Sequence, residues 1–135
     1  LDVGCGSGIL SVAALLLGAK SAVGVDIDEM AVKTAKENAV LNGVEDRFTV
    51  LAGNLTDKVE GKYNVVAANI VADAIIMLSK DIKNYMYDDS VYIMSGIIDT
   101  RVDDVLNAIG DTFEIKEKLL ENGWCCLVAT LKEEK

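Results

Sequence analysis

The sequence has no histidine, no proline and only three cysteines. Without histidine, Ser-His and Cys-His catalysis and histidine-ligated metal sites are excluded within these 135 residues. An odd cysteine count with an adjacent pair makes a poor disulfide framework, and the spacing of Cys5, Cys125 and Cys126 does not suit a zinc site. We therefore expect a reduced, cytoplasmic protein without a metal.

Long apolar runs and excess positive charge are also lacking. No run is long enough to cross a bilayer, and no signal peptide is visible, so we expect no membrane partner. Acidic residues outnumber basic ones by 22 to 13, giving a net charge of −9. This balance argues against direct binding to nucleic acid, which needs clustered Lys and Arg. It is compatible with a basic protein substrate, although ordinary solubility is the better explanation.

The most informative stretch is the glycine-rich run at the start of the chain. Gly4, Gly6 and Gly8 form a G-x-G-x-G pattern between an apolar strand end and an apolar helix. Glycines permit positive φ and let a ligand approach the backbone, and the following helix offers free N–H groups. In the dinucleotide fingerprint, G-x-G-x-x-G, the third glycine falls where this chain has Ile9. A diphosphate cradle is therefore disfavoured.

Strand and helix patterns alternate five times, and the chain then closes with a hairpin around Asn122-Gly123. The first strand is expected to end at Val3, and the other strands are expected at 21–25, 47–51, 64–68, 91–94, 113–118 and 124–131. Helices are expected at 8–17, from 28 to about 41, after 69–72 with Ile75, Ile76, Ile82 and Met86 on the apolar side, and around Val102, Val105, Leu106 and Ile109. The pattern predicts a single α/β domain over 1–135, Rossmann-like, with a mostly parallel sheet flanked by helices and an antiparallel C-terminal hairpin.

Three packing expectations accompany this fold. The helix over 8–17 is almost wholly apolar or small, so we expect it to be buried on more than one side. Trp124 is interpreted as a core residue rather than a substrate contact, and Cys5 as a small packing residue. Asp28 is expected to cap the helix that follows it.

The run Leu1–Gly8 resembles motif I of the class I S-adenosylmethionine-dependent methyltransferases. The resemblance implies that S-adenosyl-L-methionine is the cofactor and that Gly4, Gly6 and Gly8 contact its methionine part. Asp26 follows the next strand, 26 − 4 = 22 residues after the first glycine, close to the roughly 20 expected for a ribose-binding acid. The alternative for Asp26 is a solvated loop acid or a helix cap, which Asp28 fits better.

Three further polar residues are candidates at the strand ends. Asp2 is expected to be buried near the loop, binding its N–H groups or the amino group of the cofactor. Asn54 could bind the adenine edge, and it is equally well explained as an ordinary turn residue. Asn69 could accept a hydrogen bond from an incoming amine and aim its lone pair at the reactive methyl group. A helix N-cap is the alternative for Asn69, and one residue could serve both purposes.

Five blocks of sequence, in order, resemble the PrmA family of ribosomal protein methyltransferases: 1–11, 23–28, 37–44, 68–72 and 95–98. The block around Asn69 discriminates best, because adenine and glutamine amino-methyltransferases carry Asn/Asp-Pro-Pro-aromatic there. The family's Pro-Gly-Gly turn before the fifth strand is replaced by residues 87–90, a departure confined to that turn. The resemblance implies cofactor binding by Gly4, Asp26 and Asn69.

The resemblance also implies methylation of lysine side chains and an N-terminus of a ribosomal protein at the large-subunit stalk base. It further implies that an N-terminal substrate-recognition domain, and a threonine-containing cofactor segment, are missing from these residues. We expect the 135 residues alone to bind the cofactor weakly and to be inactive. Two alternatives stay open: a methyltransferase of the same fold acting on RNA or a small molecule, and a non-catalytic cofactor-binding module.

Overall fold

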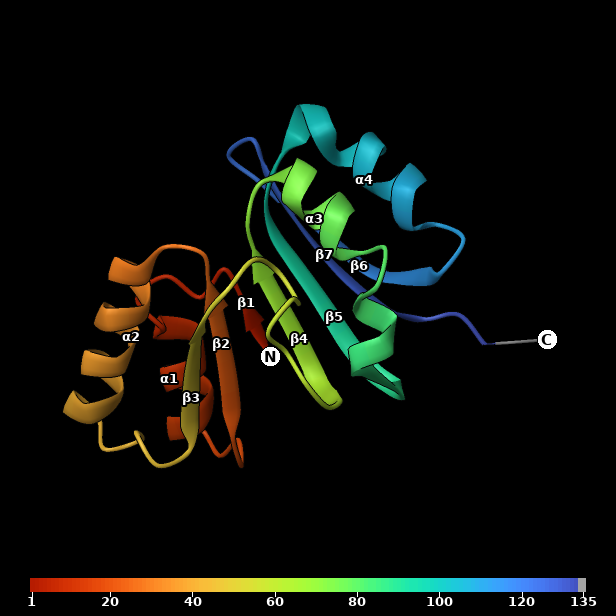
Figure 1. Ribbon diagram of the computed structural model, residues 1–135. Helices are drawn as coiled ribbons and strands as arrows, with labels where there is room; N and C mark the ends of the chain where they lie inside the picture. The colour runs from red at the N-terminus through yellow and green to blue at the C-terminus, as the bar shows by residue number, and fades with distance from the viewer. Residues whose placement is uncertain (134–135) are drawn as a thin grey trace. The chain divides into compact units, whose positions relative to one another are not determined.

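The computed structural model describes residues 1–133, which form two compact units that divide between Val59 and Glu60. The first unit contains three parallel strands in the order β3-β2-β1 and two helices (Figure 1). Its elements are β1 (Asp2–Val3), α1 (Ile9–Leu16), β2 (Ala22–Asp26), α2 (Glu29–Leu41) and β3 (Phe48–Ala52). In the parallel register Asp2 lies beside Gly24 and Asp26 beside Ala52, so the loops after all three strands leave from the same edge.

Helices α1 and α2 share one core with β3. The apolar side chains of this core are Cys5, Val12, Leu15, Val32, Ala35, Ala39, Val44, Phe48 and Val50. The packing role expected for Cys5 is thereby confirmed. The burial expected for the first helix is wrong, because α1 buries only Ser11, Val12 and Leu15, and Leu17 after it is 88% exposed. One stripe of the helix is buried in this core, while Ile9 and Leu16 are 70% and 59% exposed.

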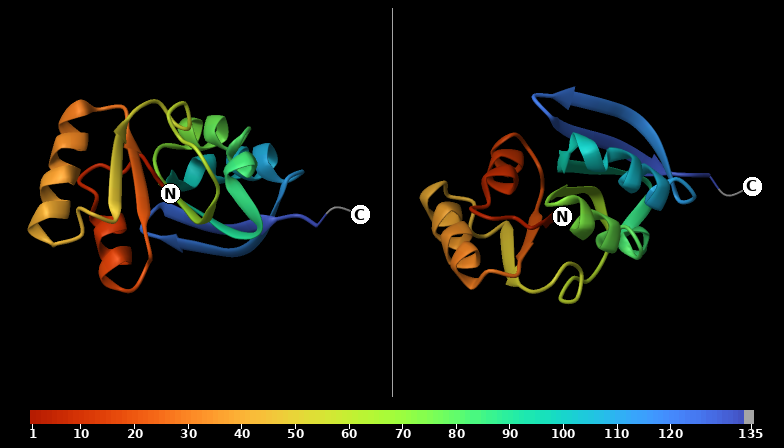
Figure 2. Two further views of the ribbon diagram at one scale, coloured as in Figure 1. Left: turned by 60° about the horizontal axis from the view of Figure 1, so that its bottom comes forward. Right: turned by 90° about the horizontal axis from the view of Figure 1, so that it is seen from above.

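The second unit contains a mixed sheet in the order β4-β5-β7-β6. Strands β4 (Tyr63–Asn69) and β5 (Met86–Ile98) are parallel, while β7 (Trp124–Leu131) runs antiparallel to both β5 and β6 (Phe113–Glu121). Helices α3 (Ala72–Leu78) and α4 (Val102–Ile109) lie on one face of this sheet (Figures 1 and 2). Two short 3₁₀ turns, η1 (Ile82–Tyr85) and η2 (Asp99–Arg101), precede β5 and α4.

The face of the sheet beneath α3 and α4 forms the core of the second unit. The tilted rings of Tyr92 and Phe113 pack there with centroids 5.2 Å apart, and Cys125 and Leu127 of β7 are buried on the same face. The Trp124 side chain points to the opposite face of β7 from Cys125 and Leu127, and it is 56% exposed. The expectation of a core tryptophan is therefore wrong, because successive strand residues point to opposite faces and the helices cover only one of them.

The helix expected after Asn69 is shorter than its apolar pattern predicts. It ends at Leu78, and Met86 is already the first residue of β5. At this end the Ser79 hydroxyl donates to the Ile75 carbonyl oxygen at 2.6 Å and lies 3.0 Å from the Tyr92 hydroxyl. A serine that bonds back to the preceding turn slightly destabilises a helix and often bends it.

The remaining elements follow the predicted pattern closely. Asp28 caps α2 by accepting from the Met30 N–H at 2.9 Å, as expected. Asn122 and Gly123 both have positive φ, which is the type I′ geometry of a tight hairpin. Residues 87–90 form an irregularity within β5. Tyr63 pairs with Met86 and Val65 pairs with Val91, so 87–90 lie opposite the single β4 residue between them. Among residues 1–133, no helix is long and apolar enough to span a membrane.

Candidate active site

The glycine loop, residues 4–8, is tied to the end of β2 by backbone hydrogen bonds. The N–H groups of Gly4 and Cys5 both donate to the Val25 carbonyl oxygen, at 2.8 and 3.0 Å. Gly4, Gly6 and Gly8 all have positive φ, so the sequence needs glycine here for backbone geometry. The loop is consequently a well-defined turn.

Asp26 is the side chain that closes this turn. Its Oδ2 accepts from the Gly6 N–H and its Oδ1 from the Asp28 N–H, both at 2.9 Å. The Asp26 backbone oxygen also accepts from the Gly53 N–H at 3.0 Å, so all three strand ends of the first unit meet at this residue. Each carboxylate oxygen retains a further lone pair, since an ionised carboxyl group has about four acceptor sites. Asp26 can therefore hold the loop and still accept from a diol.

Two glycines of the loop differ in their surroundings. A Cβ at Gly6 would meet no atom within 4 Å, so a ligand can approach the backbone there. At Gly8 a Cβ would lie 3.0 Å from Phe48 Cε2 and 3.1 Å from the Ala35 Cβ. Gly8 thus lets α1 pack closely against α2 and β3, whereas Gly6 offers an open surface.

Asp2 is buried beneath the loop and is bound by α1. Its Oδ2 accepts from the Ser11 hydroxyl at 2.9 Å, and both residues are almost fully buried. Burial raises the pKa of Asp2, and the negative charge of Asp26 raises it further, while the Ser11 hydrogen bonds oppose the shift. Sequence reasoning missed Ser11, although a lone hydroxyl in an otherwise apolar helix start was a usable signal.

The carboxyl groups of Asp2 and Asp26 make the surroundings of the loop electronegative. Burial, followed by the charges of Asp2 and Asp26, raises the pKa of the Cys5 thiol to about 12, which keeps it neutral and unreactive. Neither carboxyl group is paired with a Lys or Arg in the described chain. A diphosphate would be repelled here, whereas a cationic ligand with free hydroxyl groups would be attracted.

Asn54 lies exposed in the turn that follows β3. Its backbone N–H donates to Asp57 Oδ1 at 2.9 Å, and its carbonyl oxygen accepts from the Asp57 N–H at 3.1 Å. A Cβ at Gly53 would lie 2.6 Å from the same Asp57 oxygen, so Gly53 makes room for this bond. Asp57, which the sequence reasoning did not single out, therefore shapes the turn and leaves the Asn54 side chain at the surface.

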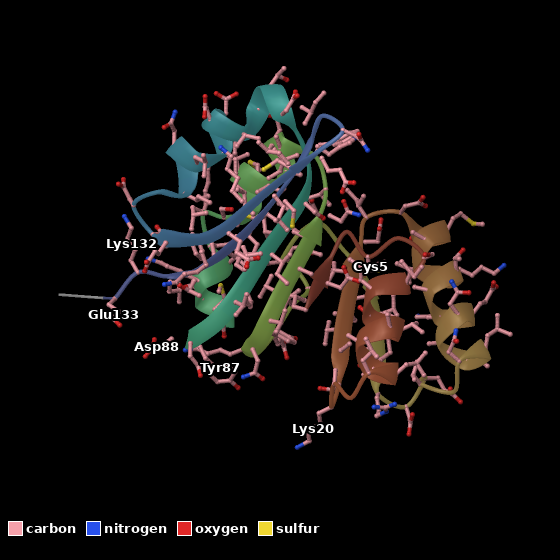
Figure 3. All side chains as sticks on the ribbon, turned by 180° about the vertical axis from the view of Figure 1, so that it is seen from behind. Cys5, Lys20, Tyr87, Asp88, Lys132 and Glu133 are labelled. Carbon is pink, nitrogen blue, oxygen red and sulfur yellow. The ribbon has the colours of Figure 1, made fainter. Side chains whose placement is uncertain are left out.

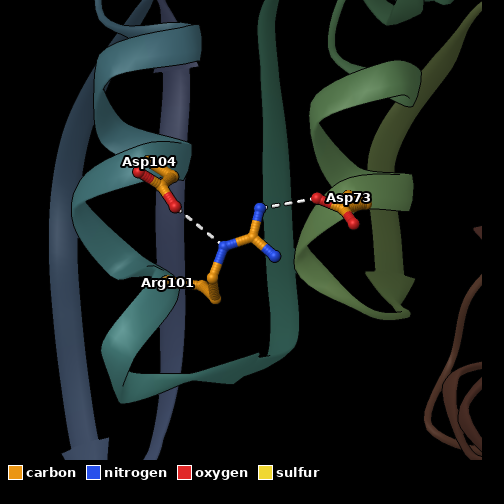
Figure 4. Close-up of polar contacts among 3 residues, drawn as sticks. All are labelled: Asp73, Arg101 and Asp104. Carbon is orange, nitrogen blue, oxygen red and sulfur yellow. Dashed lines mark hydrogen bonds and ion pairs between the residues drawn. The ribbon is translucent and has the colours of Figure 1, made fainter.

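Asn69 stands at the carboxyl end of β4, in the second unit, and is exposed. Helix α3 begins after Val71 and has no side-chain cap, so the alternative role of Asn69 as an N-cap is wrong. Four residues further on, Asp73 in the first turn of α3 binds Arg101, which also binds Asp104 at 2.8 Å (Figure 4). These ion pairs link the first turn of α3, which follows Asn69, to the start of α4.

A cavity of about 970 Å³ lies in the second unit. Asp88, Lys132 and Glu133 line it, and Figure 3 places them together near Tyr87 at one end of the unit. Its lining mixes both signs of charge and includes none of the predicted site residues. The start of β5 and the end of β7 border it, so it lies away from the strand end that carries Asn69.

Comparison with known proteins gives one consistent result. The family model described as ribosomal protein L11 methyltransferase (PrmA) matches residues 1–132. A protein of that name from Clostridium botulinum is 47% identical over 132 residues, covering 97% of this chain and 42% of the relative. Another, from Caldicellulosiruptor bescii, is 48% identical over 130 residues, covering 96% of this chain and 42% of the relative. The chain thus spans less than half the length of these relatives.

Solved structures agree on the fold. The crystal structure of ribosomal protein L11 methylase from Lactobacillus delbrueckii subsp. bulgaricus superposes with a TM-score of 0.94 at 34% identity, over 98% of this chain and 69% of that one. TrmK of M. capricolum, solved with S-adenosylhomocysteine, has a TM-score of 0.80 at 18% identity over 98% of this chain and 61% of that one, a likeness of fold alone. The predicted Rossmann-like methyltransferase fold is confirmed.

Proposed function

Because this chain belongs to the family of ribosomal protein L11 methyltransferases, we propose that it is the cofactor-binding and catalytic part of an enzyme that methylates that ribosomal protein. The acceptors would be amines, namely lysine side chains and the N-terminus of the protein at the stalk base of the large ribosomal subunit. The reaction would take place in the cytoplasm. The part of the relatives that lies outside the matched residues would supply substrate recognition.

The observation that carries the cofactor assignment is the bond from Gly6 to Asp26 beside an open backbone. We assign Asp26 to the ribose hydroxyls of S-adenosyl-L-methionine, Asp2 to its amino group, and the backbone at Gly4 and Gly6 to its methionine part. Gly8 supports the turn by packing, and Asn54 is assigned to the adenine edge. The cofactor, when bound, supplies an electrophilic methyl group on a positively charged sulfur. The negative charges of Asp2 and Asp26 suit such a ligand.

Asn69 is proposed to hold the acceptor amine. Its Oδ1 can accept a hydrogen bond from the amine, which orients the nitrogen lone pair. A lysine amine has a reference pKa of ~10.4, so only about one in 10³ is neutral at pH 7. These 135 residues contain no histidine, and they need no base of their own if the amine binds in its neutral form. We propose that the contribution of these residues is to position the amine and to exclude water from it.

Methylation of RNA is the second candidate, since RNA methyltransferases share the fold. Those structures are 20–21% identical to this chain and so establish the fold alone. The net charge of −9 argues against an RNA-binding surface on these residues. The protein substrate is accordingly favoured.

The test uses the full-length protein. Calorimetry with S-adenosyl-L-methionine measures cofactor binding, and transfer of a labelled methyl group is compared between purified ribosomal protein L11 and ribosomal RNA. We expect labelling of the protein only, and a loss of about 10²-fold in kcat for Asn69→Ala, the usual scale for losing a positioning contact. Labelling of RNA instead, or unchanged turnover of Asn69→Ala, would contradict the proposal.

A further inference from the structure

We infer that Gly96 is a positioning residue for Asn69, an inference that rests on the proposed role of Asn69. The two residues come together through the pairing of β4 with β5. In that parallel register Asn69 lies beside Ser95, so Gly96 is the next residue along the neighbouring strand. Both residues belong to the second unit, and their relationship is defined by that unit alone.

Gly96 lies in a bulge of β5. On β7, Leu127 pairs with Met94 and Cys125 pairs with Ile97. Two residues of β5, Ser95 and Gly96, therefore oppose the single residue Cys126. Gly96 has φ of +78°, which is the left-handed glycine conformation found in one common type of bulge. Such bulges are enriched next to active sites, where they redirect side chains.

The space beside Gly96 is filled by the Asn69 carboxamide. A Cβ at Gly96 would lie 2.7 Å from Asn69 Oδ1 and 3.2 Å from the Ile70 carbonyl oxygen. The first distance is far inside van der Waals contact, so any larger residue at 96 would have to displace the oxygen that is proposed to accept from the amine. Asn69 Oδ1 therefore lies in the space that a side chain at position 96 would occupy.

This contact matters because α3 does not define the position of the carboxamide. The helix has no side-chain cap, so Asn69 is not held by capping. The terminal torsion of an asparagine side chain has broad preferences, and a neighbouring wall narrows them. A reaction can slow by about 10²-fold when a group that aligns the reactant is misplaced by about 1 Å. The Gly96 backbone bounds the carboxamide on one side, and the missing side chain leaves the space that Oδ1 occupies.

A purely structural role for Gly96 makes different predictions, and the chain offers a matched control. Gly61 also lies in the second unit, has φ of +85°, and a Cβ added there would meet no atom within 4 Å. Gly61→Ala therefore carries the cost of positive φ without the contact. Gly96→Ala carries both, and any difference between the two variants reports on the contact with Asn69.

The experiment is a double-mutant cycle in the full-length protein with Gly96→Ala, Asn69→Ala, the double variant and Gly61→Ala. Turnover on ribosomal protein L11, melting temperature and the side-chain amide signals of Asn69 by NMR are measured, the last two without cofactor. We expect Gly96→Ala to lower kcat by at least about tenfold in the wild-type background and less than about twofold in the Asn69→Ala background. It should shift the Asn69 amide signals, which Gly61→Ala should leave in place.

Equal loss of kcat in both backgrounds, or unchanged Asn69 amide signals in Gly96→Ala, would overturn the inference. If Gly96→Ala alone does not fold, the double variant decides: a folded double variant supports the clash, and an unfolded one overturns it. Should Asn69→Ala keep full turnover, the proposed function fails, yet the NMR signals and melting temperatures still report whether Gly96 fixes the carboxamide. The two failures are therefore distinguishable.

Discussion

Asp26 Oδ2 accepts a 2.9 Å hydrogen bond from the Gly6 N–H and so joins the glycine loop to the end of β2. The carboxylate has two tasks in our proposal, since it shapes the loop and faces the ribose. Asp26→Asn removes the charge and one of the two acceptor oxygens. Hydrogen bonds to charged groups contribute about 1.5–3 kcal/mol, so we expect the Kd for S-adenosyl-L-methionine to rise by roughly 10- to 150-fold.

Calorimetry on the full-length protein checks this value. Asp28→Asn is the matched control, because Asp28 is exposed and asparagine caps a helix as well as aspartate does. Its Kd should stay within about threefold of the wild type. Equal affinities of the two variants for S-adenosyl-L-methionine would show that Asp26 does not bind the cofactor.

Gly6 and Gly8 should separate binding from packing. Gly8→Ala combines positive φ with a crowded Cβ, so it should lower the free energy of unfolding by about 2–5 kcal/mol, the sum of left-handed strain and overpacking. Gly6→Ala should cost only the strain, about 1–2 kcal/mol, but should weaken cofactor binding by covering the open backbone. Gly43→Ala, at φ of +69° with open space, is the control for strain alone. Urea denaturation and calorimetry supply the measurements, and a Gly8→Ala cost no larger than that of Gly43→Ala would contradict the packing role.

The buried Asp2 should impose a pH dependence on stability. Its pKa is raised above the reference value of 3.8, chiefly by burial, so the folded state keeps the proton to a higher pH than the unfolded chain. Stability therefore falls as the pH rises from 3.8 through the raised pKa, and the full penalty applies above it. Asp2→Asn, which can still accept from Ser11, removes the penalty. We expect the unfolding free energy of Asp2→Asn minus that of the wild type to increase over this window; a constant difference would show that Asp2 does not titrate there.

Arg101 should contribute little stability, and that contribution should depend on salt. The guanidinium lowers the pKa of Asp73, first through their hydrogen bond, so this pair stabilises the fold above the reference pKa of 3.8 and loses its effect as the pH falls through the lowered value. Asp73 is exposed, and at about 1 M salt the screening length is only about 3 Å. Arg101→Gln should lower the melting temperature slightly in low salt and not at about 1 M salt, where screening removes the attraction. Lys116→Gln, which removes another exposed ion pair, is the control; a salt-independent loss would contradict an electrostatic role.

Much of the fold was predictable because its signals are local. Alternating strand and helix patterns, the cap at Asp28 and the Asn122-Gly123 turn each depend on a few neighbouring residues. The meeting of the glycine loop with Asp26 was also predictable, since parallel strands bring their carboxyl ends to one edge. These features require no knowledge of which apolar faces become covered.

The errors arose where tertiary contacts decide. The helical pattern around Ile76 and Ile82 continues past Ser79, but the hydroxyl of Ser79 is used by Ile75 and Tyr92 and the helix stops. Trp124 looked like a core residue, yet only the other face of its strand is covered by helices. In the site, Ser11 and Gly96 were missed because their roles consist of contacts with residues elsewhere in the sequence.

The bulge at Ser95-Gly96 has a consequence for the whole end of β5. Tyr92 and Met94 point toward the helices, and in a regular strand of the same sequence Gly96 would be the next to do so. The extra residue shifts the inward-outward alternation of side chains by one position. Ile97 therefore points inward instead and is fully buried opposite Cys125. Deleting Gly96 would make the strand regular and keep Ile97 inward, but it would remove the space beside Asn69. The alternation of buried side chains on the inner face would therefore be preserved, whereas the proposed acceptor site at Asn69 would be lost.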